Sequence, residues 1–192
     1  MIRLAIVGDI GSGKSYVAKQ FGYPVFNADA EVAKLYRKSR KCYSKLKKAL
    51  PNYITSFPVK KSELFEAITK NEYNLKKIVR IVHPEVQSEM NNFIKKNKNK
   101  KIIVLDIPLL MENKINKKDD ILIFIDAKKK EIDKRLKKKP NFNLKIIKKF
   151  KELQLPIEFK KRQSNFVIKN NFRNNSVKKN VKQVLEKILQ NA

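Results

Sequence analysis

A glycine-rich turn near the start of the chain constrains the fold more than any other feature. Residues 8–15 read GDIGSGKS, which is a complete match to the pattern G-x-x-x-x-G-K-[ST]. A short apolar run over residues 3–7 precedes the turn, and an amphipathic helical pattern over residues 14–21 follows it. The order strand, glycine turn, helix is the context in which this pattern binds nucleotide phosphates. The alternative is a chance glycine-rich turn.

The rest of the chain alternates between strand-like and helical segments. Apolar runs over residues 102–107, 121–125 and 166–168 predict buried parallel strands, and residues 24–27 predict a shorter one. Helical patterns lie between them, over residues 30–50, 62–69, 74–82, 129–138, 144–153 and 177–189. This alternation predicts an α/β fold in which helices flank a five-stranded parallel sheet.

Two intervals interrupt the alternation. Residues 30–101 contain helical patterns, loops and prolines without a convincing strand, which predicts a helical, substrate-binding insertion. Residues 137–161 predict two short helices around Pro140 and Pro156, in the position of a lid. We expect both to belong to a single domain over residues 1–192.

The chain is strongly basic, with a net charge of +28. This charge favours polyanions such as nucleic acids, nucleotides and phosphorylated coenzymes. Lysines recur along the whole chain instead of forming one basic segment, and a chain also rich in Asn and Ile suggests A- and T-rich codons. We therefore interpret the charge as a solvated lysine surface, with a dedicated nucleic-acid face as the alternative.

The composition also excludes some classes of protein. Cys42 is the only cysteine, so an intramolecular disulfide is impossible, and we expect a small, partly buried side chain there. The apolar runs are far shorter than the roughly 18 residues that a membrane span needs. The first residues lack the pattern of a signal peptide, which predicts a cytoplasmic protein.

The glycine-rich turn predicts a site for ATP and Mg²⁺. We expect the backbone N–H groups from Ile10 to Ser15 to point into a concavity that holds phosphate oxygens. Lys14 would reach the β and γ phosphates, and the Ser15 hydroxyl would bind Mg²⁺. The residues predicted to bind the nucleotide here are Asp9, Ile10, Gly11, Ser12, Gly13, Lys14, Ser15 and Tyr16.

A carboxylate follows the second strong apolar run. Asp106 ends the sequence KIIVLD, which suits a direct or water-mediated ligand of Mg²⁺ at the end of a neighbouring strand. A turn-forming aspartate is the competing interpretation.

Four further segments resemble the dephospho-CoA kinase family. They are NADAEVAKLY, VHPEV, DIPLLMEN and SNFVIKNN, which begin at residues 27, 82, 106 and 164. The resemblance implies a P-loop kinase fold similar to the nucleoside monophosphate kinases, with residues 30–101 as a helical CoA-binding subdomain. It also implies MgATP-dependent phosphorylation of the ribose 3′-hydroxyl of dephospho-CoA, which completes coenzyme A.

The resemblance assigns catalytic roles to two more residues. Asp29 matches the general base, which accepts the proton of the 3′-hydroxyl. Asp29 would also suit the N-cap of a helix that starts near Ala30. Arg135 matches a lid arginine that neutralises charge on the transferred phosphoryl group, and a surface cation on a lysine-rich helix is its alternative.

The resemblance also predicts contacts with the acceptor and the adenine. The residues predicted to bind dephospho-CoA, besides Asp29, are His83, Pro108, Leu109, Leu110 and Glu112. Packing at a strand end would explain the leucines as well, and His83 before Pro84 would also suit the end of a helix. Asn170 matches the adenine-side loop, and Gln154 matches a glutamine of the lid.

Four positions depart from the pattern of the family. Asn27 and Asn165 stand where an Asp is usual, Asp9 where a second glycine is common, and Lys139 where a second lid arginine is expected. Lys139 keeps the charge of an arginine but lacks its planar, bidentate fork. Asp9 places a negative charge beside the phosphate loop, which weakens ATP binding unless the carboxylate faces solvent.

Two other functions fit parts of the sequence. A kinase of another nucleoside or nucleotide acceptor would share the loop, the lid and an early carboxylate. A nucleic-acid-binding P-loop ATPase would explain the charge, but the chain has no recognised nucleic-acid-binding module and no aromatic-interleaved basic motif.

Overall fold

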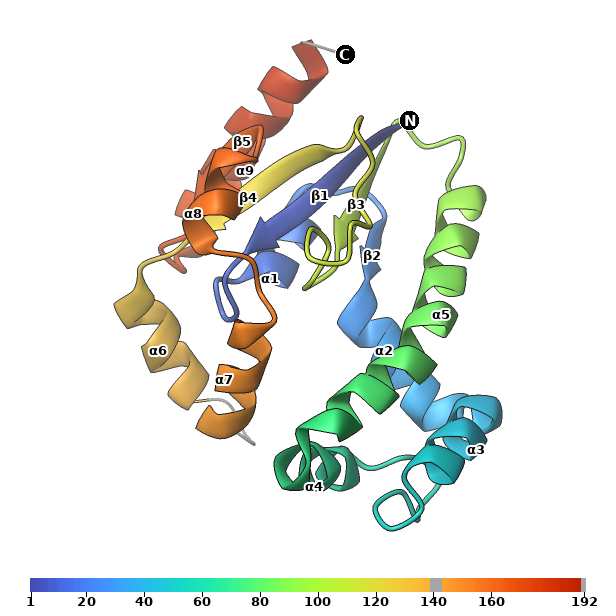
Figure 1. The fold of residues 1–192 in the computed structure, drawn as a ribbon. Coiled ribbons are helices and arrows are strands. Elements are labelled where there is room, and N and C mark those ends of the chain that lie inside the picture. The colour runs from blue at the N-terminus through green and yellow to red at the C-terminus, as the bar shows by residue number, and fades with distance from the viewer. Residues whose placement is uncertain (139–142, 191–192) are drawn as a thin grey trace. The chain divides into compact units, whose positions relative to one another are not determined.

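The computed structural model describes residues 1–138 and 143–190. The chain forms two compact units (Figure 1). Met1–Asn27 and Asn97–Ala192 make up one of them, here called the sheet unit, and Ala28–Lys96 make up the other, the helical unit.

The sheet unit contains a five-stranded parallel sheet, as predicted. Its strands run in the order β2-β3-β1-β4-β5, and every neighbouring pair is parallel. The strands are β1 (Ile2–Gly8), β2 (Val25–Asn27), β3 (Ile102–Asp106), β4 (Ile121–Asp126) and β5 (Phe166–Lys169). Since β3 and β4 flank β1 on opposite sides, the strand order reverses at β1, where α/β sheets bind ligands at the carboxyl ends of the strands.

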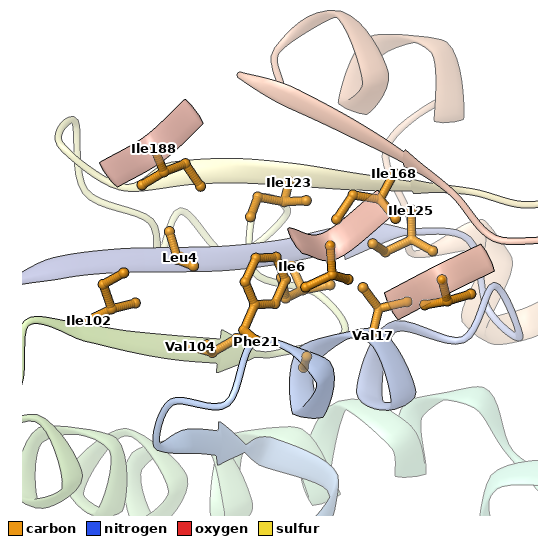
Figure 2. Close-up of a cluster of buried hydrophobic side chains, with 13 residues drawn as sticks. Leu4, Ile6, Val17, Phe21, Ile102, Val104, Ile123, Ile125, Ile168 and Ile188 are labelled. Atoms are coloured by element: carbon orange, nitrogen blue, oxygen red, sulfur yellow. The ribbon is translucent and has the colours of Figure 1, made fainter. Parts of the chain in front are cut away.

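Two helices cover one face of this sheet. Alternate strand residues such as Leu4, Ile6, Ile123 and Ile125 point to that face and are buried (Figure 2). They pack against apolar residues of α1 (Lys14–Gln20) and α9 (Asn174–Gln190), namely Val17, Ala18, Val177, Val181 and Ile188. This core fixes β1 and α1, which are the two elements on either side of the glycine-rich turn.

Three further helices complete the described part of the sheet unit. They are α6 (Lys129–Lys137), α7 (Leu144–Glu152) and α8 (Ile157–Arg162). The last of them packs beside β1. The segment predicted to be a lid contains α7 and α8, while Lys139 and Pro140 lie outside the described residues.

The helical unit has its own apolar core. It consists of α2 (Ala28–Lys38), α3 (Arg40–Ala49), α4 (Lys61–Lys70) and α5 (Glu72–Lys96). Buried residues of these helices and their loops form one cluster, which includes Leu46, Ile54 and Ile78. Cys42 belongs to it and is fully buried, more than the partly buried side chain expected, and this burial raises the pKa of its thiol.

The single helix predicted over residues 30–50 is wrong, because Ser39 divides it. The Ser39 hydroxyl accepts a hydrogen bond from the Cys42 N–H, so it caps α3 at its N-terminus. Ser39 closes α2 at the same place, which gives two shorter helices.

The helix end expected at Pro84 is also wrong, since α5 continues through Pro84 to Lys96. Proline has no N–H to donate within the helix, which ordinarily breaks it. The helix nevertheless buries Ile78 and Val82 before the proline and Met90 after it. Packing on both sides outweighs the missing hydrogen bond.

Among the described residues, no helix is long and apolar enough to cross a membrane.

Candidate active site

The glycine-rich turn connects β1 to α1 in the order that the motif requires. Gly11 and Gly13 have φ values of 85° and 90°, in the left-handed region that favours glycine. A Cβ on Gly13 would collide with the side-chain amide of Asn170, and one on Gly11 would press against Leu136 at 3.0 Å. The close approach of neighbouring elements therefore requires glycine at both positions.

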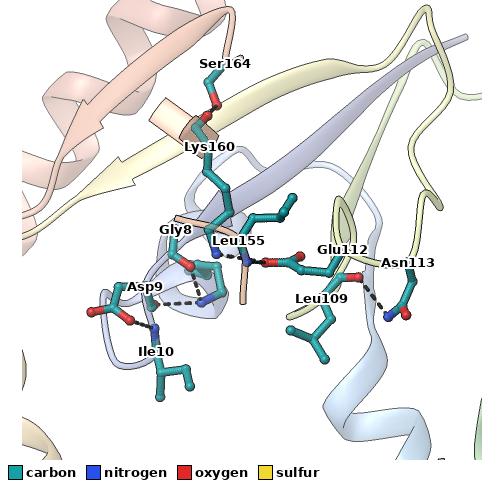
Figure 3. Close-up of polar contacts among 10 residues, drawn as sticks. Gly8, Asp9, Ile10, Leu109, Glu112, Asn113, Leu155, Lys160 and Ser164 are labelled. Carbon is teal, nitrogen blue, oxygen red and sulfur yellow. Dashed lines mark hydrogen bonds and ion pairs between the residues drawn. The ribbon is translucent and has the colours of Figure 1, made fainter. Parts of the chain in front are cut away.

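The first residues of the turn are bonded to one another. Asp9 accepts the Ile10 N–H on its side-chain Oδ1 at 2.6 Å (Figure 3). Its backbone carbonyl accepts the Ser12 N–H at 3.2 Å. The expectation that all N–H groups from Ile10 to Ser15 point into the phosphate concavity is thus wrong for these two donors. The Asp9 side chain itself uses one of them.

Lys14 lies along its own loop. Its Nζ donates to the carbonyl of Gly8 at 3.2 Å and to the carbonyl of Asp9 at 2.8 Å. The ammonium is therefore held at the end of β1, where the phosphate-binding motif requires a cation.

Asp9 does not simply face solvent. Its Oδ2 lies 3.4 Å from Nζ of Lys151, which belongs to the last turn of α7. The Asp9 side chain is only 21% exposed. A cation from a distant part of the sequence therefore neutralises the acidic residue of the loop.

Three polar side chains meet at the carboxyl edge of β2 and β3. Asn27 and Asp106 are register partners at the ends of these strands, and Nδ2 of Asn27 donates a hydrogen bond to Oδ2 of Asp106. The same nitrogen lies 3.3 Å from Oγ of Ser15. Asp106 is 2% exposed, so its carboxylate is fixed beside the phosphate loop.

This edge of the sheet fits Mg²⁺. No group of three His, Cys, Asp or Glu side chains suitable for a metal occurs in the described residues. Mg²⁺ usually binds through one or two protein oxygens together with waters and substrate phosphates. The hydroxyl of Ser15 and the carboxylate of Asp106 supply oxygen ligands of that kind.

Asn170 links the far side of the loop to the end of β5. Its Nδ2 donates to the carbonyl of Ser12 at 2.7 Å, and its Oδ1 accepts the Phe172 N–H at 2.9 Å. The side chain is buried. Asn170 therefore supports the phosphate loop and the β5–α9 connection.

Arg135 lies over an aromatic ring beside this connection. Its guanidinium carbon is 4.4 Å from the centroid of the Phe172 ring, within the range of a cation–π interaction. Residues 171–176 line an open cavity of about 660 Å³. Tyr16 reaches the same connection, where its hydroxyl bonds to Oδ1 of Asn174 at 2.8 Å.

The segment after β3 is tied to α8. Oε1 of Glu112 accepts hydrogen bonds from Nζ of Lys160 at 3.1 Å and from the Leu155 N–H at 3.0 Å (Figure 3). The side chains of Lys160 and Glu112 are 2% and 9% exposed. Leu110 is also buried, whereas Pro108 and Leu109 are partly exposed.

The remaining predicted site residues lie in the helical unit. Asp29 is exposed in the first turn of α2, and His83 is exposed on α5. Since α2 begins at Ala28, Asp29 is not its N-cap, and that alternative is wrong. An acidic side chain in the first turn still stabilises the helix through its dipole.

Sequence reasoning missed four residues of the sheet unit that shape the site. The sequence marks Asn27 only as a departure from the family pattern. It does not identify Lys151, Lys160 or Phe172 as site residues. The two lysines look like their many neighbours in the sequence, and only the folded structure shows that one is buried and the other meets Asp9.

The comparisons with known proteins place the chain among kinases. Residues 2–177 match the family model of dephospho-CoA kinase. A dephospho-CoA kinase of Wolbachia sp. subsp. Brugia malayi is 32% identical over 190 residues, which cover 96% of this chain and 97% of that protein.

Solved structures share the fold. A protein from Thermus thermophilus superposes with a TM-score of 0.74 at 24% identity, covering 99% of this chain and 97% of that one. Dephospho-CoA kinase from Campylobacter jejuni superposes with a TM-score of 0.63 at 20% identity, covering 98% of each chain. The predicted P-loop kinase fold is therefore confirmed. The chain belongs to the dephospho-CoA kinase family, whose reaction is the ATP-dependent last step of coenzyme A biosynthesis.

Proposed function

We propose that this chain phosphorylates the ribose 3′-hydroxyl of dephospho-CoA with ATP and Mg²⁺, in the cytoplasm. The observation that carries the proposal is the meeting of Ser15, Asn27 and Asp106 at one edge of the sheet, beside the loop that holds Lys14. Phosphoryl transfer requires a phosphate-binding loop, a cation site and a base close together.

In this proposal the loop holds the triphosphate. Lys14 leaves the carbonyls of Gly8 and Asp9 and donates to the β and γ phosphates. Ser15 and Asp106 would hold Mg²⁺, which would neutralise charge on the phosphate oxygens. The backbone and the buried core fix these groups in advance, so that little reorganisation is needed.

Asp29 acts as the general base. Consecutive Cα atoms are 3.8 Å apart, so the Cα of Asp29 lies within about 7.6 Å of the Cα of Asn27 at the end of β2. Chain connectivity thus keeps Asp29 near the edge that carries Asp106. The Asp29 carboxylate accepts the proton of the 3′-hydroxyl while that oxygen forms its bond to the γ phosphorus and the bond to the ADP oxygen breaks.

The other predicted residues take supporting roles. Arg135, which lies over the ring of Phe172 beside the 171–176 cavity, is the cation that neutralises charge on the transferred phosphoryl group. Pro108 and Leu109 give the acceptor an apolar surface, whereas the predicted contact of Leu110 is not available in this structure, since Leu110 is buried. Glu112 orients that segment through Lys160, and His83 contributes a contact from α5.

The test compares two variants. We expect Asp29→Asn to lower kcat by about 10³-fold with ATP affinity nearly unchanged, because it removes only the base. We expect Lys14→Ala to lower kcat by about 10²-fold or more and to weaken ATP binding as well. ADP release with dephospho-CoA measures turnover, and isothermal titration calorimetry measures the dissociation constant of ATP.

Glu31→Gln is the matched control for Asp29→Asn. Glu31 lies in the same first turn of α2, where it pairs with Lys34, and its loss should leave turnover almost unchanged. Near-normal turnover in Asp29→Asn would refute the base assignment.

The same assay separates the competing functions. If nucleosides or nucleotides release ADP and dephospho-CoA does not, the chain is a kinase of another acceptor. If RNA or DNA stimulates ATP hydrolysis and dephospho-CoA consumes none, the nucleic-acid-binding ATPase replaces the kinase.

A further inference from the structure

We propose that Lys151 is a positioning residue for ATP. Its ammonium neutralises Asp9, the acidic second residue of the phosphate loop, and the loop can then hold a triphosphate. The inference rests on the proposed use of this loop for ATP. It concerns two residues that the sequence separates by 142 positions and the fold brings into contact.

Asp9 lies within the phosphate loop. Its Oδ1 bonds to the Ile10 N–H at 2.6 Å, and its side chain is 21% exposed. The carboxylate is therefore partly screened from water and close to the site where the phosphates bind. A like charge at such a position opposes the binding of an anion.

Two lysines contact Asp9, one at its backbone and one at its side chain. Nζ of Lys14 donates to its backbone carbonyl at 2.8 Å, and Nζ of Lys151 lies 3.4 Å from its Oδ2. Lys14 contacts the backbone of Asp9, whereas Lys151 contacts its carboxylate, so Lys151 stays on the carboxylate when Lys14 turns to the phosphates. Its charge then offsets that of Asp9 for the incoming ATP.

A buried ion pair holds the end of α7, the helix that carries Lys151, in place. Four residues further along, the Leu155 N–H bonds to Glu112, which also pairs with the buried Lys160 of α8. The end of α7 is thus attached to the segment after β3. The negative end of the α7 dipole also favours a cation in its last turn.

The other lysines of α7 provide the contrast that the test needs. Lys145 and Lys148 are exposed on the same helix, whereas the Lys151 side chain is only 36% exposed. Lys148→Met therefore removes the same charge from the same helix without touching Asp9.

The experiment is a double-mutant cycle read out as the dissociation constant of ATP by calorimetry. We expect Lys151→Met to weaken ATP binding about tenfold when Asp9 is present, and less than about twofold in the Asp9→Asn background. Lys151→Arg should restore binding to within about twofold, and Lys148→Met should have no such effect. At saturating ATP, kcat of Lys151→Met should stay close to that of the wild type, because Lys151 acts through binding.

Two outcomes would overturn the inference. An equal loss of affinity in both backgrounds would mean that Lys151 acts on the phosphates without Asp9. An unchanged affinity for Lys151→Met in the presence of Asp9 would mean that the pair has no role in binding. Failure of the proposed function has a different signature, in which the wild type neither binds ATP nor releases ADP with dephospho-CoA.

Discussion

The sheet unit and the helical unit accommodate charged groups in opposite ways. The sheet unit buries two ion pairs whose members are far apart in sequence. Arg3 meets Asp120 at 2.8 Å, and Lys160 meets Glu112 at 3.1 Å. In the helical unit, Glu85 pairs with the exposed lysines 41 and 45 at the surface.

The shifts in pKa show which force dominates in each unit. Burial raises the pKa of Asp120 even though Arg3 and Lys117 act to lower it. Burial also opposes the charge of Glu63, but hydrogen bonds from Thr55, Ser56 and Lys60 lower its pKa to about 2. Desolvation thus dominates for Asp120, and hydrogen bonding dominates for Glu63. Charge removal should therefore cost most where the partner left behind is buried.

Lys160→Met is the strongest test of this comparison. It leaves the carboxylate of Glu112 buried without its cation, and we expect the free energy of unfolding to fall by about 4 kcal/mol. Urea unfolding measures this loss. The double variant Lys160→Met/Glu112→Leu should recover most of it, because no buried charge then remains.

Lys161→Met is the matched control on the same helix. Lys161 pairs with Asp126 at 3.0 Å, and both side chains are more than a third exposed. Its removal should have little effect on stability. Equal losses in the two variants would show that burial of the Lys160 pair has no special importance.

Asn27→Asp tests the polar edge of the sheet unit with a smaller change. It replaces the hydrogen-bond donor of Asp106 by a second carboxylate, and we expect a loss of about 2 kcal/mol without Mg²⁺. Millimolar Mg²⁺ should reverse much of this loss, because two carboxylates attract a divalent cation. Thermal unfolding with and without Mg²⁺ measures both effects.

Asn27→Ala separates the two contributions, since it removes the donor without adding charge. Its stability should not respond to Mg²⁺. If Asn27→Asp is equally insensitive to Mg²⁺, this edge of the sheet is not a metal site.

The sequence predicts the sheet well because local patterns determine it. Buried parallel strands are nearly continuous apolar runs, and β3 and β4 are of this kind. The glycine-rich turn predicts its own strand and helix for the same reason. The helix boundaries at Ser39 and Pro84 were wrong because they depend on a cap and on packing, which outweigh the intrinsic preference of the chain.

Only those residues of the candidate site that belong to a sequence motif could be predicted. Lys14, Ser15 and Asp106 come from patterns that imply phosphate chemistry, and the structure gathers the last two around Asn27. The contacts of Lys151 and Lys160 are not local, since their partners lie 142 and 48 residues away. In a chain with 46 basic residues, no local signal distinguishes these two lysines from the others.

Glu63→Gln gives the smallest expected effect and tests the helical unit. Glu63 accepts hydrogen bonds from Thr55, Ser56 and Lys60 at the start of α4, so its replacement should cost about 1 kcal/mol near neutral pH. Hydrogen exchange of the α4 amides measures this cost locally. The exposed Glu66 lies on the same helix, and Glu66→Gln is the control.

The pH dependence of this cost follows from the lowered pKa of Glu63. Because the folded pKa is about 2 and the ordinary value is 4.5, the unfolded chain binds the proton more readily. The stabilisation from Glu63 is therefore fully present above about pH 5 and is lost as the pH falls towards 2. The difference between the wild type and Glu63→Gln should shrink as the pH falls from about 5 to about 2. A difference that stays constant over this range would mean that the ionised carboxylate does not stabilise α4, and the contrast between the two units would then fail at Glu63.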